Sequence, residues 1–516
     1  MLAAWIKLFG LAVAGLALNT FAGAPNVGRI SPLAVTPGKM SIVTLSGDNL
    51  QGAVDLWTSF PCETTLANTS NSTAFELKLP TQPRAGVGAI RLVTTNGLSG
   101  LHLLLIDPLP AVEASVTNHA LATAQHLSGP IAVDGTCEEL RSDFYRVTAK
   151  RNERLSIEAV AQRLGSPLDP LLRLLDAQGR ELAANDDAPG LGADARLDFH
   201  CPKTGDYLIE VRDTRHAGGP RHRYRLRVGE PLPTPLPFMA STEVTKLTQP
   251  IAPLRQAGEK EPNDKADQAQ SLRLPVELSG HFDQPGDRDV YEFQAGKGER
   301  IIFTGRTRSL GSPCDLFLQL QTTNGTKLAE ANATSADEGI FTNRFNASGT
   351  YRLVVEELNR NGGPGFHYRV AMRELKPGFV LSTETERVSA PADDSFEIEV
   401  KVERRDYDGP IQLSTQGLPE AFAISNAVIN AKTNSTRLKI SAPSDLALGD
   451  FFPFSIVGSA AIDGATASER TSTLPALRNA FSELRHLPTE LDGLLTLGIS
   501  ESKSTNPRPP QKKRKK

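Results

Sequence analysis

The feature that most constrains the fold of this chain is an internal repeat. The stretch from Gly165 to Asp176 returns from Gly311 onward, 146 positions later. The same offset aligns apolar residues and turn glycines upstream, and an offset of 144 aligns those downstream. A match that keeps both turn glycines and apolar spacing over roughly 115 residues indicates one structural unit used twice.

Apolar and polar residues alternate within each copy, which is typical of strands with one buried face. Leu155 and Ile157 in the first copy are replaced by Ile301 and Phe303 in the second. Turns such as Asn324-Gly325 separate the apolar stretches, and Asn-Gly supplies the positive φ of a tight hairpin. Neither copy has helical apolar spacing. We therefore expect each repeat to be an antiparallel, jelly-roll-like β-sandwich.

The repeats resemble the bacterial pre-peptidase C-terminal domain, a β-sandwich appended to secreted proteins. Three features carry the resemblance: Glu261-Pro262-Asn263-Asp264 at the start of the second copy, Gly286-Asp287-Arg288-Asp289-Val290-Tyr291 before its first long strand, and a Gly-Ser-Pro-x-Asp segment in both copies. The resemblance covers the two repeats, a little under half of the chain. It implies an accessory module and not a catalyst.

Five oxygen-bearing side chains lie in two loops of the second copy. Glu261, Asn263 and Asp264 belong to its first segment, and Asp287 and Asp289 precede its first long strand. Calcium takes six to eight oxygen ligands, commonly from loops. The resemblance supports this grouping, since related collagen-binding modules of secreted collagenases use an equivalent segment for calcium. We therefore predict a calcium site. The alternative is that these residues cap a turn and accept bonds from backbone amides.

The first copy differs at the equivalent positions. Val116, Asn118 and His119 stand there, so only the amide is kept and no calcium is expected. Acidic residues gather instead in the loop Asn185-Asp186-Asp187, with Asp194 nearby. Such a loop has the ligands for a metal ion, but a solvated turn is the more common outcome for this pattern.

Two further sandwiches flank the repeats. Residues 25–108 resemble the immunoglobulin-like TIG fold, on Ile30-Ser31-Pro32 and Gly47-Asp48-Asn49-Leu50, and residues 377–474 alternate like another immunoglobulin-like sandwich. The predicted all-β chain comprises a signal peptide at 1–22, the TIG-like domain at 25–108, the first repeat at 112–230, an extended Pro-rich linker at 231–258, the second repeat at 259–375, the immunoglobulin-like domain at 377–474, and a short helix, linker and basic tail at 475–516.

The two ends of the chain have distinctive compositions. Lys7 is followed by a largely apolar run from Leu8 to Leu18, too short for the ~20 residues that span a bilayer, so a cleaved signal peptide and export are expected. The Pro-rich, basic residues 507–516 predict a disordered tail. This tail has three interpretations: a solvated end, a contact for an anionic cell surface, or a nucleic-acid patch. No aromatic residues separate its lysines for base stacking, so nucleic acid is not expected.

Four cysteines occur, and none has metal-ligand spacing: Cys62, Cys137, Cys201 and Cys314. Cys137 and Cys201 lie in one repeat near the starts of two expected strands. An internal disulfide would suit an oxidising compartment, whereas buried thiols would suit any compartment. The sequence leaves both alternatives open.

No enzyme motif occurs in the chain. His-Glu-x-x-His, Gly-x-Ser-x-Gly and the phosphate-binding loop are absent, and the nine histidines are scattered. With a net charge of −3, the chain as a whole also favours neither nucleic acid nor membrane. We expect a non-catalytic, exported binding or spacer protein for an extracellular polysaccharide or protein polymer, with calcium as its cofactor. The alternatives are an accessory component of a secreted peptidase system, with the catalytic chain separate, and an unrecognised hydrolase.

Overall fold

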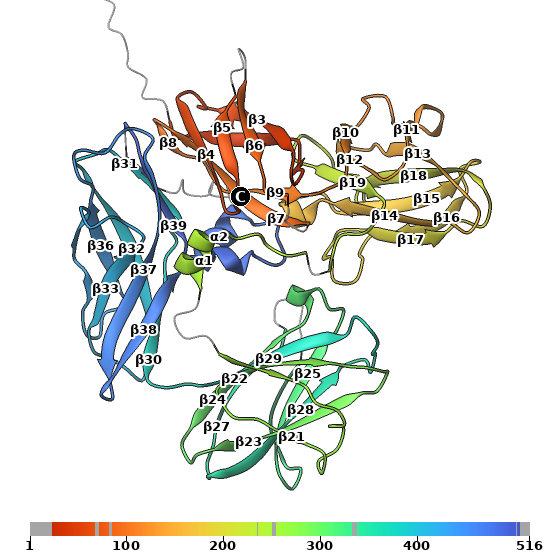
Figure 1. Ribbon diagram of the computed structural model, residues 1–516. Helices are drawn as coiled ribbons and strands as arrows, with labels where there is room; N and C mark the ends of the chain where they lie inside the picture. The colour runs from red at the N-terminus through yellow and green to blue at the C-terminus, as the bar shows by residue number, and fades with distance from the viewer. Residues whose placement is uncertain are drawn as a thin grey trace, which may run out of the picture.

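The computed structural model describes residues 23–67, 72–81, 85–234, 236–249, 254–332, 338–501 and 503–505 of the chain. Within these residues strands dominate, and α-helix is confined to α1 (Thr242–Thr248) and α2 (Leu474–Ala480). The predicted all-β class is confirmed, as is the short helix near the C-terminal end. Figure 1 shows four sandwiches arranged in space. The predicted signal peptide and the basic tail lie outside the described residues.

The N-terminal sandwich consists of two sheets. One has the order β1-β3-β6-β5, and the other the order β2-β9-β7-β4 with β8 added to β7. Its core contains Val43, Leu45, Phe75, Leu92 and Leu104. The strands are β1 (Asn26–Ser31), β2 (Ala34–Val35), β3 (Met40–Asp48), β4 (Ala53–Thr58), β5 (Glu63–Leu66), β6 (Thr73–Lys78), β7 (Gly86–Thr94), β8 (Gly97–Leu98) and β9 (His102–Ile106).

The two repeats have the same topology. The first has sheets β10-β12-β19-β14-β17 and β11-β13-β18-β15-β16, and the second has sheets β20-β22-β29-β24-β27 and β21-β23-β28-β25-β26. The strands of the first repeat are β10 (Ala111–Glu113), β11 (Gln125–Leu127), β12 (Ile131–Thr136), β13 (Asp143–Ala149), β14 (Arg154–Val160), β15 (Pro170–Asp176), β16 (Glu181–Asn185), β17 (Arg196–His200), β18 (Gly205–Asp213) and β19 (Arg223–Val228). Those of the second are β20 (Arg255–Gly258), β21 (Gln270–Ser271), β22 (Val276–His281), β23 (Arg288–Ala295), β24 (Arg300–Arg306), β25 (Leu316–Thr322), β26 (Lys327–Asn332), β27 (Ile340–Arg344), β28 (Gly349–Glu357) and β29 (His367–Glu374).

The expectation of purely antiparallel sheets is wrong at the start of each repeat. Strand β10 pairs in parallel with β12, and β11 in parallel with β13; the second repeat does the same with β20 and β22, and with β21 and β23. The first strands of each repeat lie alternately in the two sheets. Because the chain crosses between sheets and then returns, it comes back beside its own earlier strand in the same direction.

A pair of buried tyrosines marks the core of each repeat. The hydroxyls of Tyr145 and Tyr224 lie 2.5 Å apart in the first repeat, and those of Tyr291 and Tyr368 lie 2.6 Å apart in the second. In each repeat one tyrosine also donates to a buried aspartate: Tyr224 to Asp143, and Tyr368 to Asp289. The repeats therefore share an internal hydrogen-bonded group as well as their strand order.

The C-terminal sandwich includes a strand that the sequence analysis assigned to a linker. Strand β39 (Leu495–Ile499) pairs in parallel with β31 and antiparallel with β37, and all five of its residues are buried. A fully buried strand has no apolar-polar alternation, so this prediction was wrong. The other strands are β30 (Gly378–Ser382), β31 (Arg387–Ala390), β32 (Ser395–Arg405), β33 (Ile411–Gln416), β34 (Ala423–Ser425), β35 (Val428–Ile429), β36 (Ser435–Ser441), β37 (Phe451–Ile462), β38 (Ala465–Ser472) and β40 (Ser504–Thr505).

The segment 231–258 is also more structured than the predicted extended linker. It contains helix α1, capped by Ser241, whose side chain accepts a hydrogen bond from the Val244 amide at 3.2 Å. Val244 and Leu247 are buried, so packing stabilises this short helix. The segment ends in β20, which already belongs to the second repeat.

An apolar cluster joins three of the four sandwiches, and we call it the central cluster. It contains Leu103 and Leu105 of the N-terminal sandwich, Val160 of the first repeat, and residues of α1 and of the stretch from Leu477 to Leu494. Among the described residues, none of the second repeat belongs to it. Figure 1 accordingly shows α1 and α2 between the upper sandwiches and the second repeat below them. We call the described residues outside the second repeat the body.

Candidate functional site

The structure brings the predicted acidic residues of the second repeat together. Glu261, Asp264 and Asp287 form one group, and Glu259, Glu261 and Asp289 form another; within each group, one potential ligand oxygen per residue lies within 4.8 Å of the others. The groups share Glu261. The structure therefore places all four predicted acids around one place and adds Glu259, which the sequence analysis missed.

Two segments of the chain build this site. Residues 259–264 follow β20, while Asp289 lies near the start of β23. The Val290 amide donates to the Asn263 carbonyl at 2.9 Å, which holds the two segments together. Glu259 is fixed by the hydroxyl of Tyr291 at 3.0 Å and by the backbone amide of His281 at 2.7 Å. The buried tyrosine pair thus contacts the site through two hydrogen bonds, from Tyr291 to Glu259 and from Tyr368 to Asp289.

Two buried oxygens of the site have no hydrogen-bond partner among the described residues: Asn263 Oδ1 and Asp289 Oδ1. Both residues are fully buried, and buried polar atoms are almost always hydrogen-bonded. Asn263 Nδ2 donates to Glu259 at 3.2 Å, which leaves the amide oxygen as the unpaired end. A cation would satisfy both oxygens, and an all-oxygen ligand set of this kind fits calcium.

The turn-capping alternative explains less of this geometry. Asp289 accepts from the Tyr368 hydroxyl at 2.6 Å, and no bond from a backbone amide to its carboxylate is found in the described part of the chain. Asp287 does accept from the backbone amides of Asp283 and Arg288, at 2.6 and 2.9 Å. Glu261 likewise accepts from the Asn263 backbone amide at 3.0 Å. Turn capping therefore accounts for Asp287 and Glu261 and leaves Asp289 Oδ1 and Asn263 Oδ1 unexplained.

The surroundings of the site raise the pKa values of its carboxyl groups and so disfavour their ionised, negatively charged forms. Burial raises the pKa of Asp289, and the nearby carboxylates of Glu259 and Asp287 raise it further. Burial also raises the pKa of Glu261 and of Asp287, again with contributions from neighbouring carboxylates. A divalent cation would favour the ionised form of each group and so oppose these shifts.

The first repeat has different residues at the place of this site. Val116, Asn118 and His119 occupy the equivalent positions, and Arg141 replaces Asp287. His119 Nδ1 lies 3.0 Å from the carboxylate of Asp143, the counterpart of Asp289. A side chain able to carry positive charge therefore stands beside the one acid that the first repeat retains.

The acidic loop of the first repeat is a structural feature. Asp194 is fully buried and accepts from the backbone amides of Ala161 and Gln162 at 3.0 and 2.7 Å, and from Arg163 Nε at 2.6 Å. Asn185 donates to the Asp187 carbonyl within the turn at 3.3 Å. Asn185, Asp186 and Asp187 thus form a partly exposed turn, as the solvated-turn alternative expects, whereas Asp194 is a buried acid paired with Arg163 and is not solvated.

All four cysteines are free thiols, so the structure contains no Cys137 to Cys201 disulfide. Both of these thiols are buried, and burial raises the pKa of each.

No helix of the described residues is long and apolar enough to cross a membrane.

Comparison with known proteins identifies one domain. Residues 141–213 match the bacterial pre-peptidase C-terminal domain, so one domain of this family lies in the first repeat, and this part of the predicted resemblance is confirmed. A probable subtilase-type serine protease of Deinococcus radiodurans is 39% identical over 70 residues. That stretch is 13% of this chain and 9% of the protease, so the match spans only a small part of either protein.

Solved structures give weak matches. The Bacteroides ovatus mixed-linkage glucan utilization locus SGBP-B, in complex with a mixed-linkage heptasaccharide, is 13% identical with a TM-score of 0.18, over 68% of this chain and 74% of that one. The catalytic domain with the CBM51-1 and CBM51-2 domains of Clostridium perfringens ZmpB is 8% identical with a TM-score of 0.14, over 65% and 55%. Scores this low carry no argument about function.

Proposed function

We propose that this chain is an exported, non-catalytic protein that binds an extracellular polysaccharide or protein polymer. The observation that carries the proposal is the contrast between the repeats. The first is packed into the body, while the second lies outside the central cluster and keeps a group of acidic ligands. An accessory type of domain presented in this way is suited to recognition by its loops and sheet faces.

We further propose that calcium binds at Glu261, Asn263, Asp264, Asp287 and Asp289, with Glu259 as an additional ligand. The unpaired oxygens of Asn263 and Asp289 and the surrounding carboxylates support this assignment. Bound calcium would hold the first segment of the second repeat against β23. Its role would be to fix the shape of the loops and not to activate a substrate.

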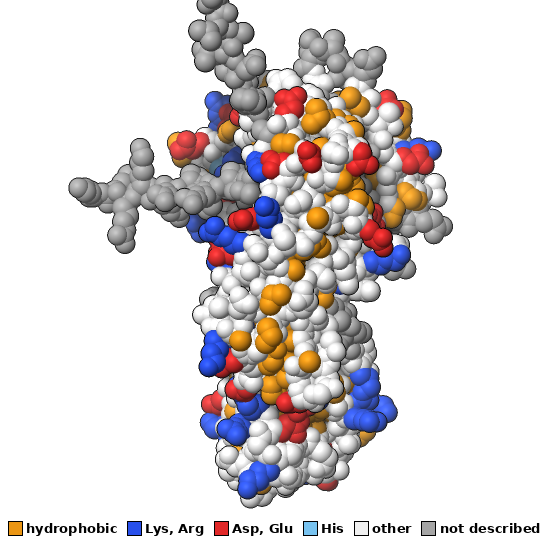
Figure 2. Space-filling model, turned by 90° about the vertical axis from the view of Figure 1, so that its left-hand side faces the viewer, with side chains coloured by type: hydrophobic (Ala, Val, Ile, Leu, Met, Phe, Trp, Pro, Cys, Tyr) orange, Lys and Arg blue, Asp and Glu red, His pale blue; other side chains and the backbone are white. Residues whose placement is uncertain are grey.

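Export and cell-surface contact belong to the same proposal. The sequence of residues 1–22 supports a cleaved signal peptide, and the basic residues 507–516 support contact with an anionic surface. Figure 2 shows acidic and basic side chains interspersed over one face of the molecule, so this face offers no patch of a single charge. The tail is thus the more suitable element for charge-based attachment.

A second candidate is an accessory component of a secreted peptidase system. The partial identity to a probable subtilase-type serine protease favours this candidate, because there a stretch similar to part of this chain occurs within a protease. In this case the catalytic chain would be a separate protein.

The test is a binding screen of the full mature chain against immobilised polysaccharides and collagen-like polymers, in calcium and in EGTA. We expect retention on at least one polymer, reduced by EGTA and by the double variant Glu261→Gln with Asp289→Asn. Retention on none of them would contradict polymer binding. Stable co-purification with a peptidase would then support the second candidate, whereas turnover of a polymer would contradict the non-catalytic assignment.

A further inference from the structure

A hollow of about 250 Å³ lies where the second repeat meets the body. Its walls come from the end of α1, strand β29 of the second repeat, strand β38 of the C-terminal sandwich, and the turn before β39. We call it the polar pocket, because every lining residue except Gly493 has a polar side chain, among them Gln249, Arg373, Glu469, Arg470 and Asp492. A ligand in it must therefore be held by hydrogen bonds and not by apolar contact.

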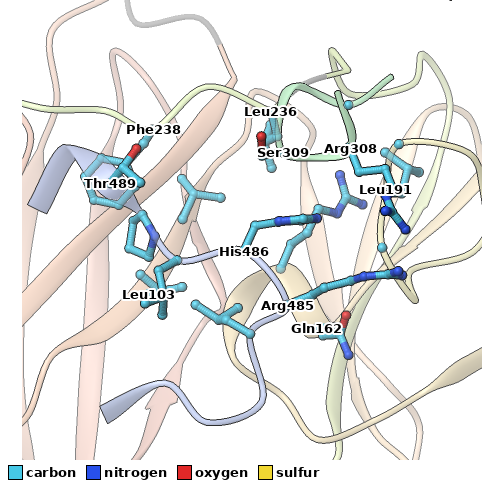
Figure 3. Close-up of a pocket in the computed structure, with 18 of the residues that line it drawn as sticks. Leu103, Gln162, Leu191, Leu236, Phe238, Arg308, Ser309, Arg485, His486 and Thr489 are labelled. Carbon is cyan, nitrogen blue, oxygen red and sulfur yellow. The ribbon is translucent and has the colours of Figure 1, made fainter. Parts of the chain in front are cut away.

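A second hollow between the second repeat and the body has a different lining. Leu103 and Phe238 lie on one side of it, while Arg308 and Arg485 lie on the other, as Figure 3 shows. Glu490 adds an acid to the same lining. This mixture of apolar surface, arginines and an acid does not select one class of ligand, whereas the polar pocket offers one kind of surface.

The charges that line the polar pocket balance. Arg373 and Arg470 are matched by Glu469 and Asp492, so the lining carries no net charge. Burial raises the pKa of Glu469, and the charges of Arg405 and Arg373 oppose this rise. An anion in the pocket would meet the two acids, and a cation would meet the two arginines. The lining therefore favours an uncharged ligand.

Hydrogen-bond donors of the lining are left without partners. The Nε atom of Arg470 is buried and makes no hydrogen bond among the described residues. Its Nη1 atom donates only to neutral groups, namely Gln416 at 3.3 Å and Ser455. The side chains of Arg373 and Gln249 also make no hydrogen bond to the described residues. Because buried donors are almost always paired in proteins, these groups are available to a ligand.

The two acids of the lining supply acceptors. Asp492 Oδ1 accepts from the Ser472 hydroxyl at 2.7 Å and from the Thr473 amide at 2.8 Å, and no bond to Oδ2 is found in the described part of the chain. The carboxylate of Glu469 likewise accepts no hydrogen bond from the described residues. Open donors and open acceptors therefore line the same space.

We propose that the polar pocket binds one uncharged sugar residue of a polysaccharide. A sugar hydroxyl donates one hydrogen bond and accepts others, so it can bond a carboxylate and a guanidinium at the same time. An apolar side chain of a protein polymer would leave these groups unpaired. Since a cavity of about 150 Å³ holds a benzene ring, the larger volume here has room for a pyranose ring. This proposal rests on the proposed function and narrows it to a neutral polysaccharide.

The test is saturation-transfer NMR of the full mature chain, in calcium, with five uncharged sugars at about 10 mM: glucose, galactose, mannose, xylose and N-acetylglucosamine. Glucuronic acid and glucosamine, which carry opposite charges, are titrated in parallel. We expect at least one uncharged sugar to bind, and both charged sugars to bind more weakly. Arg373→Gln and Arg470→Lys should each weaken binding about tenfold, because each removes charged hydrogen bonds. The control is Arg369→Gln, since Arg369 is exposed on the same face of β29 and does not line the pocket.

The same variants also enter the polymer screen, which separates this proposal from polymer binding itself. The pocket proposal would be overturned by binding of no uncharged sugar, by tighter binding of either charged sugar, or by unchanged binding in pocket variants whose circular dichroism matches the parent. Polymer binding would still stand if the parent and the pocket variants were retained equally, or if only collagen-like polymers retained the chain. Retention on no polymer would instead overturn the proposed function, and this proposal with it.

Discussion

The two repeats share strand order, turn glycines and a buried tyrosine pair, yet they differ at the surface. In the first repeat the outward side chains of β19 are buried: Arg225 and Arg227 both reach Asp107, at 2.9 and 3.0 Å, and Arg225 also reaches Asp134 at 2.7 Å. The equivalent of Arg225 in β29 is Arg369, which is exposed. In the first repeat β19 thus packs against the N-terminal sandwich, whereas the equivalent position of β29 in the second repeat is exposed to solvent.

The same contrast holds at the acidic site. The second repeat gathers carboxylates there, whereas the first has Val116, His119 and Arg141 at the equivalent positions. The core group of two tyrosines and one aspartate is unchanged. The core therefore fixes the fold, and the residues around it are free to take up either a docking role or an ion-binding role.

The largest difference between the two repeats is expected when their equivalent arginines, buried Arg225 and exposed Arg369, are replaced. Arg225→Met should destabilise the body by about 3–5 kcal/mol, because it breaks a buried ion pair and leaves acids without their partner. Arg369→Met, at the equivalent exposed position, should change stability by about 0.5 kcal/mol or less. Differential scanning calorimetry of both variants checks this. Equal effects would show that β19 and β29 are not in different environments.

Calcium removal should have the next largest effect. At a calcium concentration 100 times the dissociation constant, binding should stabilise the second repeat by about 2.7 kcal/mol, and EGTA should remove this gain. The double variant Glu261→Gln with Asp289→Asn should show no calcium response in the same scans. Asp186→Asn in the acidic loop of the first repeat is the control. If Asp186→Asn abolished the calcium response, the calcium site would have to be assigned to the first repeat.

It should be possible to build the proposed calcium site into the first repeat. Four changes copy the ligands of the second repeat: Ala114→Glu, Val116→Glu, His119→Asp and Arg141→Asp. Since Asn118 and Asp143 are already in place, we expect calcium stoichiometry measured by titration to rise from one to two. A folded variant that still binds one ion would show that the ligand set is incomplete.

The acidic site should also make stability depend on pH when calcium is absent. The pKa values of Asp289, Asp287 and Glu261 are raised in the folded state, so folding favours their protonated forms. Their effect is absent below the ordinary carboxyl range near pH 4 and becomes destabilising as pH rises above it. The melting-temperature gain from calcium should therefore be larger at pH 8 than at pH 5. The double variant should lack this difference.

The smallest expected effect concerns the contact between the repeats. Gly190 has φ +77° and its Cα faces the Gly311 carbonyl, so Gly190→Ala should loosen the junction and enlarge the radius of gyration in small-angle scattering. Gly325→Ala shares the positive φ but meets nothing within 4 Å, which makes it the matched control. The control should keep the parent dimensions and lose about 1 kcal/mol from backbone strain. Equal dimensions in both variants would contradict a packed junction.

Much of this architecture could be predicted from the sequence, because the repeat kept both its turn glycines and its apolar alternation. Four acids of the site were predicted as well, since they lie in recognisable segments. Glu259 was missed although it stands two residues before Glu261 and so falls on the same side of an extended segment. That spacing was the available signal.

Other features had no local signal. Arg223, Arg225 and Arg227 alternate with apolar residues and therefore look like the solvent-facing side of a strand, yet another sandwich covers them. Strand β39 is buried on both faces and lacks alternation. The hollow lined by Leu103, Phe238 and Arg308 depends on how distant segments pack, which side-chain periodicity does not describe.

The central cluster has a consequence for biosynthesis. It unites Leu247, which precedes the second repeat, with residues 477–494, which follow it. On the ribosome, the second repeat can close its own core while the body still waits for its last segments to emerge. The upstream sandwiches would then expose apolar surface while the more than two hundred residues from Leu247 to Leu477 are translated. A chaperone would be most useful during this interval.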